Sequence, residues 1–495
     1  MDFKTRKINK RIPRPRSFSK RSFSLKASVI IFITLIVLLI AGIVKAIQSV
    51  DYTVILTIAG SDLQEDRYGH TNFLLLGSAD EKHEGAFLTD TIIVASLDQK
   101  KKIVSMLSIP RDLYVQDPLL GNSRINTVFL NALDYFGSNT EAMEHTKTKV
   151  EEIIGMPIHY WARIDFQGFE DLIDAIGGVD IFVEEAIHDP YYPKEGTFLF
   201  ETFELAAGEH HMDGETALKY ARSRKSTSDF DRSHRQQELL YAIKEQTLKT
   251  NIILSKDKIE SMMSALKKNI DTNISSKEIL TLGGLADDLS KDRIVRRLMH
   301  DDPTQCGGLL YTPDRRLYEG AFILIPAGGF EYLHNYIELL FYHPEIALED
   351  AKLHILNSTK IEGTAGETLQ ILERYCIDVI RYGNGKDQDN RITTYYYRQK
   401  YTEEGKKLDS RPVALDFLQK LIPGQESTEA PEEYKEYLEK ADIILDIGID
   451  YAASPDYMVD PFYYLPVVEY DDDDESLEEE SKDEVSDEKA ETLSE

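Results

Sequence analysis

The sequence predicts a layered α/β/α domain with a central mixed sheet and a smaller α/β domain, both after one transmembrane helix. Three observations support this fold class. Short apolar, β-branched runs alternate with helical stretches, which is typical of α/β layers. A second series of such runs begins near Ala351. One long uncharged apolar run lies near the N-terminus. The chain has 495 residues, of which 42% are hydrophobic, so it can bury at least one large core.

The uncharged run, "ASVIIFITLIVLLIAGIV", covers residues 27–44 and follows a basic segment over residues 1–26. Its length approaches the ~20 apolar residues that cross a bilayer. A cleaved signal peptide would have a shorter apolar stretch of ~7–15 residues before a small-residue cleavage site. A buried core helix fits badly beside so basic a flank. We therefore expect a single-pass anchor over residues 27–47 in the cell membrane, with a cytoplasmic N-terminus and an extracellular main body.

The larger domain is expected over residues 71–345, after a linker over residues 48–70. Its expected strands are apolar and often β-branched: Asn72–Gly77, Asp90–Asp98, Lys102–Pro110, 158–166 and 179–183. Continuous apolar strands of this kind usually lie buried in a sheet. The expected helices end at glycines and cover Thr140–Ile154 and 169–178. Residues 251–345 are expected to be mainly helical, with a strand, a glycine turn and a helix in "FILIPAGGFEYLHNYIELLF".

The smaller domain is expected over residues 351–455 and shows a regular alternation of strands and helices. The strands are "AKLHILNST", "RITTYYYR" and "ADIILDIGIDY", and the helices are "AGETLQILERY" and "PVALDFLQKLI". Residues 465–495 are dense in Asp and Glu. They cannot bury enough apolar surface to fold, so we expect an acidic disordered tail.

Composition excludes several functional classes. The net charge is −30, and a nucleic-acid partner is disfavoured because phosphate backbones attract widespread positive charge. The chain has two cysteines, which excludes a framework of several disulfides. Cys and His show no metal-ligand spacing, and the adjacent His210 and His211 are more often surface residues than ligands.

Arginines gather in "KYARSRKSTSDFDRSHRQQELLYAI", residues 219–243, at the start of an apolar helix. Several cations at a helix N-terminus oppose the helix dipole unless an anion lies among them. Arginine also binds phosphate oxygens two at a time. The alternative is that nearby acids neutralise these arginines in salt bridges. The spacing favours an anion site.

Asp90 precedes one predicted strand, and Arg111 and Asp112 follow the next. A hairpin brings the start of one strand beside the end of the next, so Asp90 and Arg111 can meet. A carboxylate beside arginines could hold Mg²⁺ bridged to phosphate oxygens. The alternative is a structural Asp–Arg pair.

Several motifs together resemble the LytR–CpsA–Psr family of membrane-anchored bacterial enzymes. They occur in the family's order: "FLLLG", "LTDTIIVASLD", "SIPRD", "INTVF", "GGVD" and "YARSRK" with "SDFDRSHRQQ". The resemblance is strong from about Asn72 to Gln246. Residues Ala351 to Tyr451, with "HILNST" and "DIGIDY", look like the LytR C-terminal domain that such enzymes often carry.

The resemblance implies a Mg²⁺-dependent phosphotransferase. Such enzymes move a glycopolymer from a polyprenyl-pyrophosphate carrier to a hydroxyl of peptidoglycan. The residues that match the family's catalytic arginines are Arg111, Arg222 and Arg224. Those that match the rest of the pyrophosphate pocket are Asp229, Arg232, Arg235 and Gln236. Those that match the magnesium aspartates are Asp90 and Asp80.

The chain departs from the family pattern after its first strand, where it reads "GSADEKHEG". Asp80 replaces the usual aspartate one position later, and Leu88 stands where an arginine is usual. His83 or Lys82 could supply the missing charge. Two other functions remain open: a pyrophosphatase that acts on the same lipid-linked donor, and a non-catalytic envelope-binding or regulatory protein.

Overall fold

The structure is a computed structural model. It describes residues 63–79, 86–194, 199–223, 235, 239, 242–243, 246, 269–275, 278, 293–399, 410–455 and 457–465. The chain forms two compact units whose segments interleave along the sequence. Unit 1 contains residues up to Arg111, Val115–Leu298 and Ile337–Asp350. Unit 2 contains Asp112–Tyr114, Met299–Tyr336 and the residues from Ala351 onward. The expected domain limits at 71–345 and 351–455 stay predictions.

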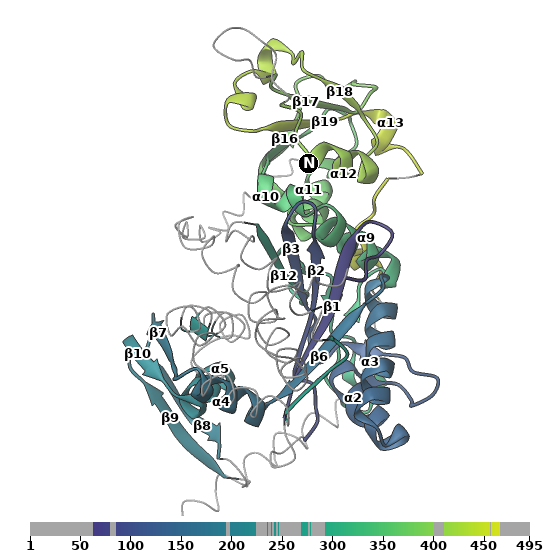
Figure 1. Ribbon diagram of the computed structural model, residues 1–495. Coiled ribbons are helices and arrows are strands. Elements are labelled where there is room, and N and C mark those ends of the chain that lie inside the picture. Colours follow the sequence, from purple (N-terminus) through teal and green to yellow (C-terminus); the bar gives the residue numbers. More distant parts are fainter. Residues whose placement is uncertain are drawn as a thin grey trace, which may run out of the picture. The chain divides into compact units, whose positions relative to one another are not determined.

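Unit 1 is built on a six-stranded mixed sheet in the order β11-β6-β1-β2-β3-β12 (Figure 1). The bounds are β1 His70–Ser78, β2 Thr91–Asp98, β3 Ile103–Ser108, β6 Tyr160–Asp165, β11 Ile270–Thr272 and β12 Ile294–Leu298. Strands β1 and β6 pair in parallel, as do β3 and β12, whereas β2 is antiparallel to both β1 and β3. The central mixed sheet of the predicted fold class is therefore confirmed.

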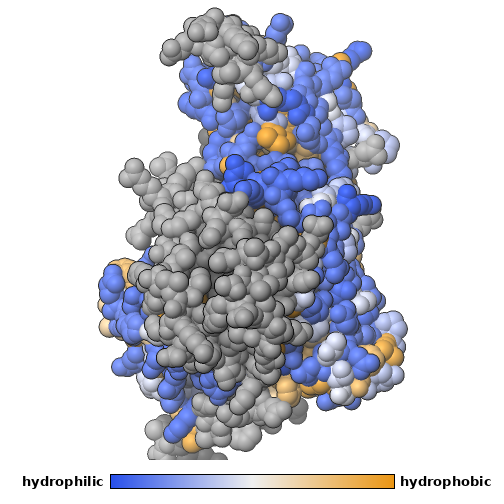
Figure 2. Space-filling model, in the orientation of Figure 1, coloured by the Kyte–Doolittle hydropathy of each residue, from blue (hydrophilic) through white to orange (hydrophobic). Residues whose placement is uncertain are grey.

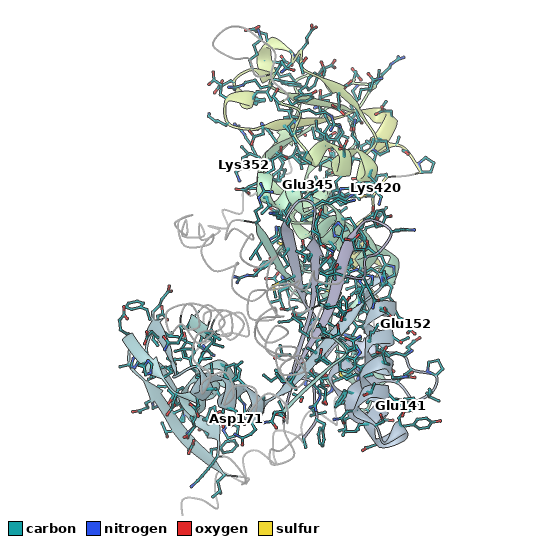
Figure 3. All side chains as sticks on the ribbon, in the orientation of Figure 1. Glu141, Glu152, Asp171, Glu345, Lys352 and Lys420 are labelled. Carbon is teal, nitrogen blue, oxygen red and sulfur yellow. A yellow bond between two sulfur atoms is a disulfide. The ribbon has the colours of Figure 1, made fainter. Side chains whose placement is uncertain are left out.

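Two helices lie side by side along one face of this sheet, α2 (Ile125–Phe136) and α3 (Asn139–Ile154) (Figure 1). The Ser138 side chain caps α3 by accepting from the Glu141 N–H, and Gly155 ends the helix in the left-handed region. Figure 3 shows Glu141 and Glu152 on the side of α3 away from the sheet. Only one face of the helix is buried, which is why its sequence alternates charged and apolar residues at helical spacing.

Unit 1 also contains a smaller layer beside the end of β6. It contains α4 (Phe166–Ala175), α5 (Gly214–Arg222) and two hairpin-like sheets. The strands of these sheets are β7 Val179–Val183 with β10 Gly208–Met212, and β8 Ile187–Pro193 with β9 Phe200–Leu205. Their inner faces share one core, which includes Leu172, Val179 and Tyr220. This core fixes α5, and with it Arg222, against α4.

Unit 2 contains a five-stranded sheet in the order β16-β15-β19-β17-β18. The bounds are β15 Lys352–Asn357, β16 Asp378–Asn384, β17 Thr394–Tyr397, β18 Gln425–Ser427 and β19 Ile443–Ile447. Its main helices are α11 (Thr364–Arg374) and α12 (Ala414–Leu421), and the Tyr395 hydroxyl donates to the carbonyls of Leu418 and Ile422 at the end of α12. Figure 2 shows a small apolar patch on the otherwise mostly hydrophilic face of this unit.

Shorter elements complete the described chain. The remaining strands and α-helices are β4 Tyr114–Val115, β5 Ser123–Arg124, β13 Leu310–Tyr311, β14 Ile325–Pro326, α9 Gly329–Tyr342, α10 Pro344–Glu349 and α13 Ile449–Ala452. Single 3₁₀ turns are η2 Arg315–Tyr318, η3 Glu432–Tyr434, η4 Tyr437–Glu439 and η5 Pro461–Tyr464. The Glu345 carboxylate on α10, labelled in Figure 3, pairs with the Lys101 ammonium at 3.0 Å.

Unit 2 is also held by two long-range links. Cys306 and Cys376 form a disulfide, which their number in the sequence did not predict. The Arg374 guanidinium, at the end of α11, donates to both carboxylate oxygens of Asp460 at 2.6 and 2.8 Å and to the Pro303 carbonyl at 2.7 Å. Both side chains of the ion pair are buried. Pro303 and Asp460 are thereby both bound to the C-terminal end of α11.

The expected location of the protein needs a correction. In the part of the chain that the structure describes, no helix is both long and apolar enough to cross a membrane. The structure therefore does not show the single span on which the predicted membrane location depended. Residues 27–47, where that span was expected, lie outside the described residues. The linker over 48–62 and the acidic tail after 465 also lie outside them.

Candidate functional site

The candidate site lies at the edge of the six-stranded sheet where β1, β3 and β6 end. The strand register sets this edge: Ser78 at the end of β1 is paired with Asp165 at the end of β6. On its other side, Gly77 is paired with Thr91, the first residue of antiparallel β2. Asp90 therefore stands beside the carboxyl ends of the parallel strands, where ligand sites in open α/β sheets gather.

Asp90 and Arg111 meet at this edge, as the hairpin geometry predicts. The Arg111 Nη1 donates to Asp90 Oδ1 at 3.2 Å. The ion pair is partly open, with 37% of the Asp90 side chain and 28% of the Arg111 side chain exposed. Among the described residues, Asp90 Oδ2 has no hydrogen-bond or ion-pair partner. Within the described part of the chain, the Arg111 contact thus holds Oδ1 of the carboxylate and not Oδ2.

Asn126, the second residue of α2, was not singled out by sequence reasoning. Its Nδ2 donates to Asp90 Oδ1 at 3.2 Å, the same oxygen that Arg111 contacts. Its Oδ1 is buried and has no hydrogen-bond partner among the described residues. A buried polar atom without a partner costs about 1–3 kcal/mol, so this amide is poorly chosen for stability alone. Asn126 belongs to "INTVF", one of the motifs of the family resemblance, but the sequence assigned no role to its side chain.

Arg163 on β6 is a second residue that sequence reasoning missed. Its guanidinium is buried and donates to Ser78 Oγ at 2.8 Å and to Asp271 Oδ2 on β11. It also lies 4.8 Å from the centre of the Phe129 ring. The contact with Ser78 links the end of β6 to the end of β1. The signal in the sequence was a charged residue inside an otherwise buried strand, "YWARID".

Arg222, the last residue of α5, has aromatic neighbours in place of acids. Its guanidinium carbon lies 4.1 Å from the centre of the Phe166 ring, and its Nη1 donates to the Tyr192 hydroxyl at 3.4 Å. Burial raises the pKa of that hydroxyl, so Tyr192 stays neutral. No carboxylate pairs with Arg222 among the described residues. The salt-bridge alternative therefore finds no support at this arginine.

Lys219, one turn earlier on α5, shows the opposite arrangement. Its ammonium pairs with Glu201 at 2.7 Å and with Glu215 at 2.8 Å. The same helix thus carries one cation that is neutralised by two acids and one that is not. Phe166, which supports Arg222, is the first residue of α4 and directly follows the end of β6. Arg222 therefore packs beside the carboxyl end of β6.

Arg235 lies in a different environment from Arg222. It is buried, and its guanidinium donates to the carbonyl oxygens of Tyr220 and Ser223 at the end of α5. These bonds satisfy carbonyls that the helix leaves without partners. Such contacts explain Arg235 without a ligand, and its expected role at a pyrophosphate stays a prediction.

The other expected site residues lie outside the described residues. They are the second metal candidate and four members of the arginine-rich segment: Asp80, Arg224, Asp229, Arg232 and Gln236. Lys82 and His83, the candidates for the missing charge, lie outside them as well. The roles assigned to these residues stay predictions.

The residues that are described fit a magnesium ion. No group of three or more His, Cys, Asp or Glu side chains that could hold a metal occurs among them. However, Mg²⁺ needs no such group, because it usually keeps several waters and binds one or two carboxylates together with substrate phosphates. Asp90 offers one open carboxylate oxygen, and Asn126 offers a buried amide oxygen without a partner.

Comparisons of the sequence place this geometry in context. The model of the LytR_cpsA_psr family matches residues 48–316. Among curated proteins, the chain is 35% identical over 196 residues to the polyisoprenyl-teichoic acid–peptidoglycan teichoic acid transferase TagV of Bacillus subtilis (strain 168). That match covers 39% of this chain and 47% of the relative. TagU of Bacillus mycoides (strain KBAB4) is 27% identical, over 43% of this chain and 62% of the relative. The chain thus spans about half to three-fifths of the length of these relatives.

Solved structures give related matches. The crystal structure of B. subtilis TagV has 25% sequence identity and a TM-score of 0.41, and the match covers 55% of this chain and 97% of that one. The structure titled "TagT bound to LI-WTA" has 24% identity and a TM-score of 0.38, over 56% of this chain and 93% of that one.

Proposed function

Because the chain belongs to the LytR_cpsA_psr family, we propose that it is a glycopolymer phosphotransferase. The donor is a glycopolymer linked through pyrophosphate to a polyprenyl carrier, and the acceptor is a hydroxyl of peptidoglycan. The names of its relatives, which are teichoic acid transferases, support this reaction class. Two alternatives are a pyrophosphatase, in which water is the acceptor at the same site, and a non-catalytic protein that only binds the envelope or regulates.

One observation carries the proposal: a half-open carboxylate and cations with differing partners gather at one sheet edge. Among the described residues, Arg111 and Asn126 both donate to Oδ1 of Asp90, and Arg222 packs on Phe166 with no acidic partner. A pyrophosphate carries several negative oxygens close together. Arg222 can bind two of them at once through its planar guanidinium, and aromatic support keeps the guanidinium oriented.

The reaction would need little covalent chemistry from the protein, because phosphoryl transfer depends mainly on positioning and charge stabilisation. The acceptor oxygen forms a bond to the phosphorus that carries the glycan, and the bond from that phosphorus to the bridging oxygen breaks. The polyprenyl phosphate leaves with the electron pair, and the hydroxyl proton passes to solvent. Arg111 and Arg222 would stabilise the charge that develops on the phosphate oxygens.

Mg²⁺ is part of the proposal, with Asp90 as its protein ligand and Asn126 beside it. When bound, the ion supplies positive charge to the pyrophosphate oxygens. The role of Asp90 is to hold that charge at the sheet edge. Arg111 and Asn126 keep its carboxylate in one orientation by donating to Oδ1.

A transfer assay tests the function. Purified protein is incubated with a polyprenyl-pyrophosphate glycan and peptidoglycan fragments, with Mg²⁺ or with EDTA, and phosphodiester-linked product is measured. Asp90→Asn should lower the rate about 100-fold or more, because it removes the negative charge that holds the cation. Asp180→Asn is the matched control, since Asp180 is an exposed acid of unit 1 that pairs with His211.

The products distinguish the alternatives. Release of free glycan phosphate in the presence of acceptor, without linked product, would identify a pyrophosphatase. Lack of any turnover by the wild type, with the donor still bound, would identify a binding protein. Equal rates for wild type and Asp90→Asn would remove Asp90 from the proposal.

We also propose that unit 2 contains the LytR C-terminal-like domain of the sequence interpretation. Its strands β15, β16 and β19 are parallel, and α11 connects β15 to β16, which agrees with the expected alternation of strands and helices. Among the described residues, the Asp446 carboxylate on β19 accepts hydrogen bonds from side chains of unit 2 itself. This supports a role for the unit outside the catalytic step.

A further inference from the structure

Asn126 contacts three parts of the candidate site at once. Its side chain donates to Asp90 Oδ1. Its backbone N–H donates to the Arg111 carbonyl at 3.3 Å. Its backbone carbonyl accepts from the N–H of Thr89 at 3.0 Å and from Thr89 Oγ1 at 3.2 Å. No sequence proximity explains these contacts, because Asn126 lies 36 residues from Asp90.

The placement of Asn126 is firm. The residue is 3% exposed and stands in the first turn of α2, between Ile125 and Val128, which are both buried. Four hydrogen bonds therefore act on a side chain and a backbone that cannot move apart. The Asp90 carboxylate, by contrast, is more than one-third exposed and has no other described partner than Arg111 and Asn126. Asn126 is the rigid member of the pair.

The two halves of the Asn126 amide have different environments. The Nδ2 half has an acceptor, Asp90 Oδ1. The Oδ1 half is buried without a donor among the described residues. An apolar side chain of similar size would avoid this unfavourable burial. Asparagine at this position is therefore explained by its contact with Asp90 and by a donor that comes with a ligand, and not by stability.

We propose that Asn126 is a positioning residue of the cation and pyrophosphate site. Its Nδ2, together with Arg111, fixes Oδ1 of Asp90, and Oδ2 is the carboxylate oxygen that would hold a cation. Its own Oδ1 accepts a hydrogen bond from an O–H group that arrives with the ligand, such as a water on the cation. The inference rests on the proposed function, because it assumes that the ligand is a cation-bound pyrophosphate.

The test measures binding, with no turnover involved. Inorganic pyrophosphate is titrated into the full chain by calorimetry, with Mg²⁺ and with EDTA, and the melting temperature is recorded with and without the ligand. Asn126→Ala removes both halves of the amide. Asn126→Asp keeps an oxygen but removes the donor and places a second carboxylate against Asp90.

Both variants should bind pyrophosphate in Mg²⁺ at least about tenfold more weakly than the wild type, as expected when a charge-assisted contact is lost. Asn126→Ala should melt at nearly the wild-type temperature without ligand, and ligand should raise that temperature less. Asn139→Ala is the matched control. Asn139 is also in the first turn of a helix in unit 1 and donates to an aspartate, Asp271, at 3.1 Å.

The outcomes separate this inference from the proposed function. Suppose that the wild type binds pyrophosphate in a Mg²⁺-dependent way and that both Asn126→Ala and Asn126→Asp bind it with wild-type affinity. The inference is then wrong, while the proposed function stands. A wild type that binds no pyrophosphate in Mg²⁺ overturns both. If Asn126→Ala fails to fold, wild-type affinity in Asn126→Asp would still overturn the inference, and a loss of affinity in a folded Asn126→Asp would support it.

Discussion

Two carboxylates at strand ends, one in each unit, differ in how their oxygens are used. Asp446 on β19 is 4% exposed, and both of its oxygens have donors. Ser358 Oγ donates to one, and the Tyr434 hydroxyl at 3.1 Å and Asn390 Nδ2 at 3.2 Å donate to the other. Asp90 has both described donors on one oxygen and is partly exposed.

Two arginines at helix ends, one in each unit, differ in a similar way. Arg374 in unit 2 is buried and makes a bidentate contact with Asp460. Arg222 in unit 1 has aromatic neighbours and no described acid. A polar group at a strand or helix end is therefore a weak indication of a site. What distinguishes a site is a group whose bonding capacity the protein does not fill.

The comparison predicts that removing a filled polar group costs stability. Arg374→Ala would leave the Asp460 carboxylate buried without its cation, and breaking a buried pair in this way costs about 3–5 kcal/mol. Chemical denaturation followed by circular dichroism should show this loss in unit 2. The double variant Arg374→Met with Asp460→Leu should recover most of it. A wild-type denaturation curve for Arg374→Ala would show that the pair contributes nothing.

A second prediction concerns pH and unit 2. Burial, with the nearby charge of Arg381 as a smaller cause, lowers the pKa of His354 from 6.5 to about 4. The folded state therefore disfavours the proton, so stability is full above pH 6.5 and is lost as the pH falls toward 4, by up to about 3 kcal/mol. His354→Phe should weaken this dependence between pH 7 and pH 5. His188→Ala, at an exposed histidine, is the control and should not alter it.

The smallest predicted effect concerns a group that the protein leaves unfilled. Arg222→Ala should weaken the binding of inorganic pyrophosphate in Mg²⁺ by about tenfold, since hydrogen bonds to charged groups contribute about 1.5–3 kcal/mol. The melting temperature should change little. Arg222→Lys should restore little binding, because an ammonium cannot make the bidentate contact with phosphate oxygens that a guanidinium makes.

Lys219→Ala is the matched control for Arg222→Ala, because Lys219 is on the same helix and its charge is already paired. It should leave pyrophosphate binding unchanged. Equal affinity of Arg222→Ala and wild type would contradict the distinction between filled and unfilled cations on α5.

Much of the sheet in unit 1 could be predicted from sequence because its strands are continuous apolar runs. The contact between Asp90 and Arg111 followed from the hairpin between β2 and β3. Strand β12 was missed because its two arginines, in "IVRRL", interrupt the apolar pattern, and pairing with β3 stabilises it nonetheless. Strand β11 has three residues and forms only by pairing with β6.

The site residues divide in the same manner. Arginines near one another in sequence suggested an anion site, which stays a prediction; among the described residues, Arg222 has no acidic partner. Sequence did not separate Arg222 from Arg235, because burial of the latter against α5 depends on tertiary structure. Asn126 lies in the motif "INTVF" of the family resemblance, but its contacts with Asp90 and Arg111 depend on the tertiary structure.

The disulfide between Cys306 and Cys376 links positions 70 residues apart. By the chain-entropy account, closing a loop of this length removes conformations from the unfolded chain that amount to about 4 kcal/mol. The family match ends at residue 316, between the two cysteines. A fragment that stops there would keep Cys306 as an unpaired thiol, able to join two molecules of the fragment by oxidation. A fragment that keeps the disulfide must therefore extend beyond the end of the family match, at least to Cys376.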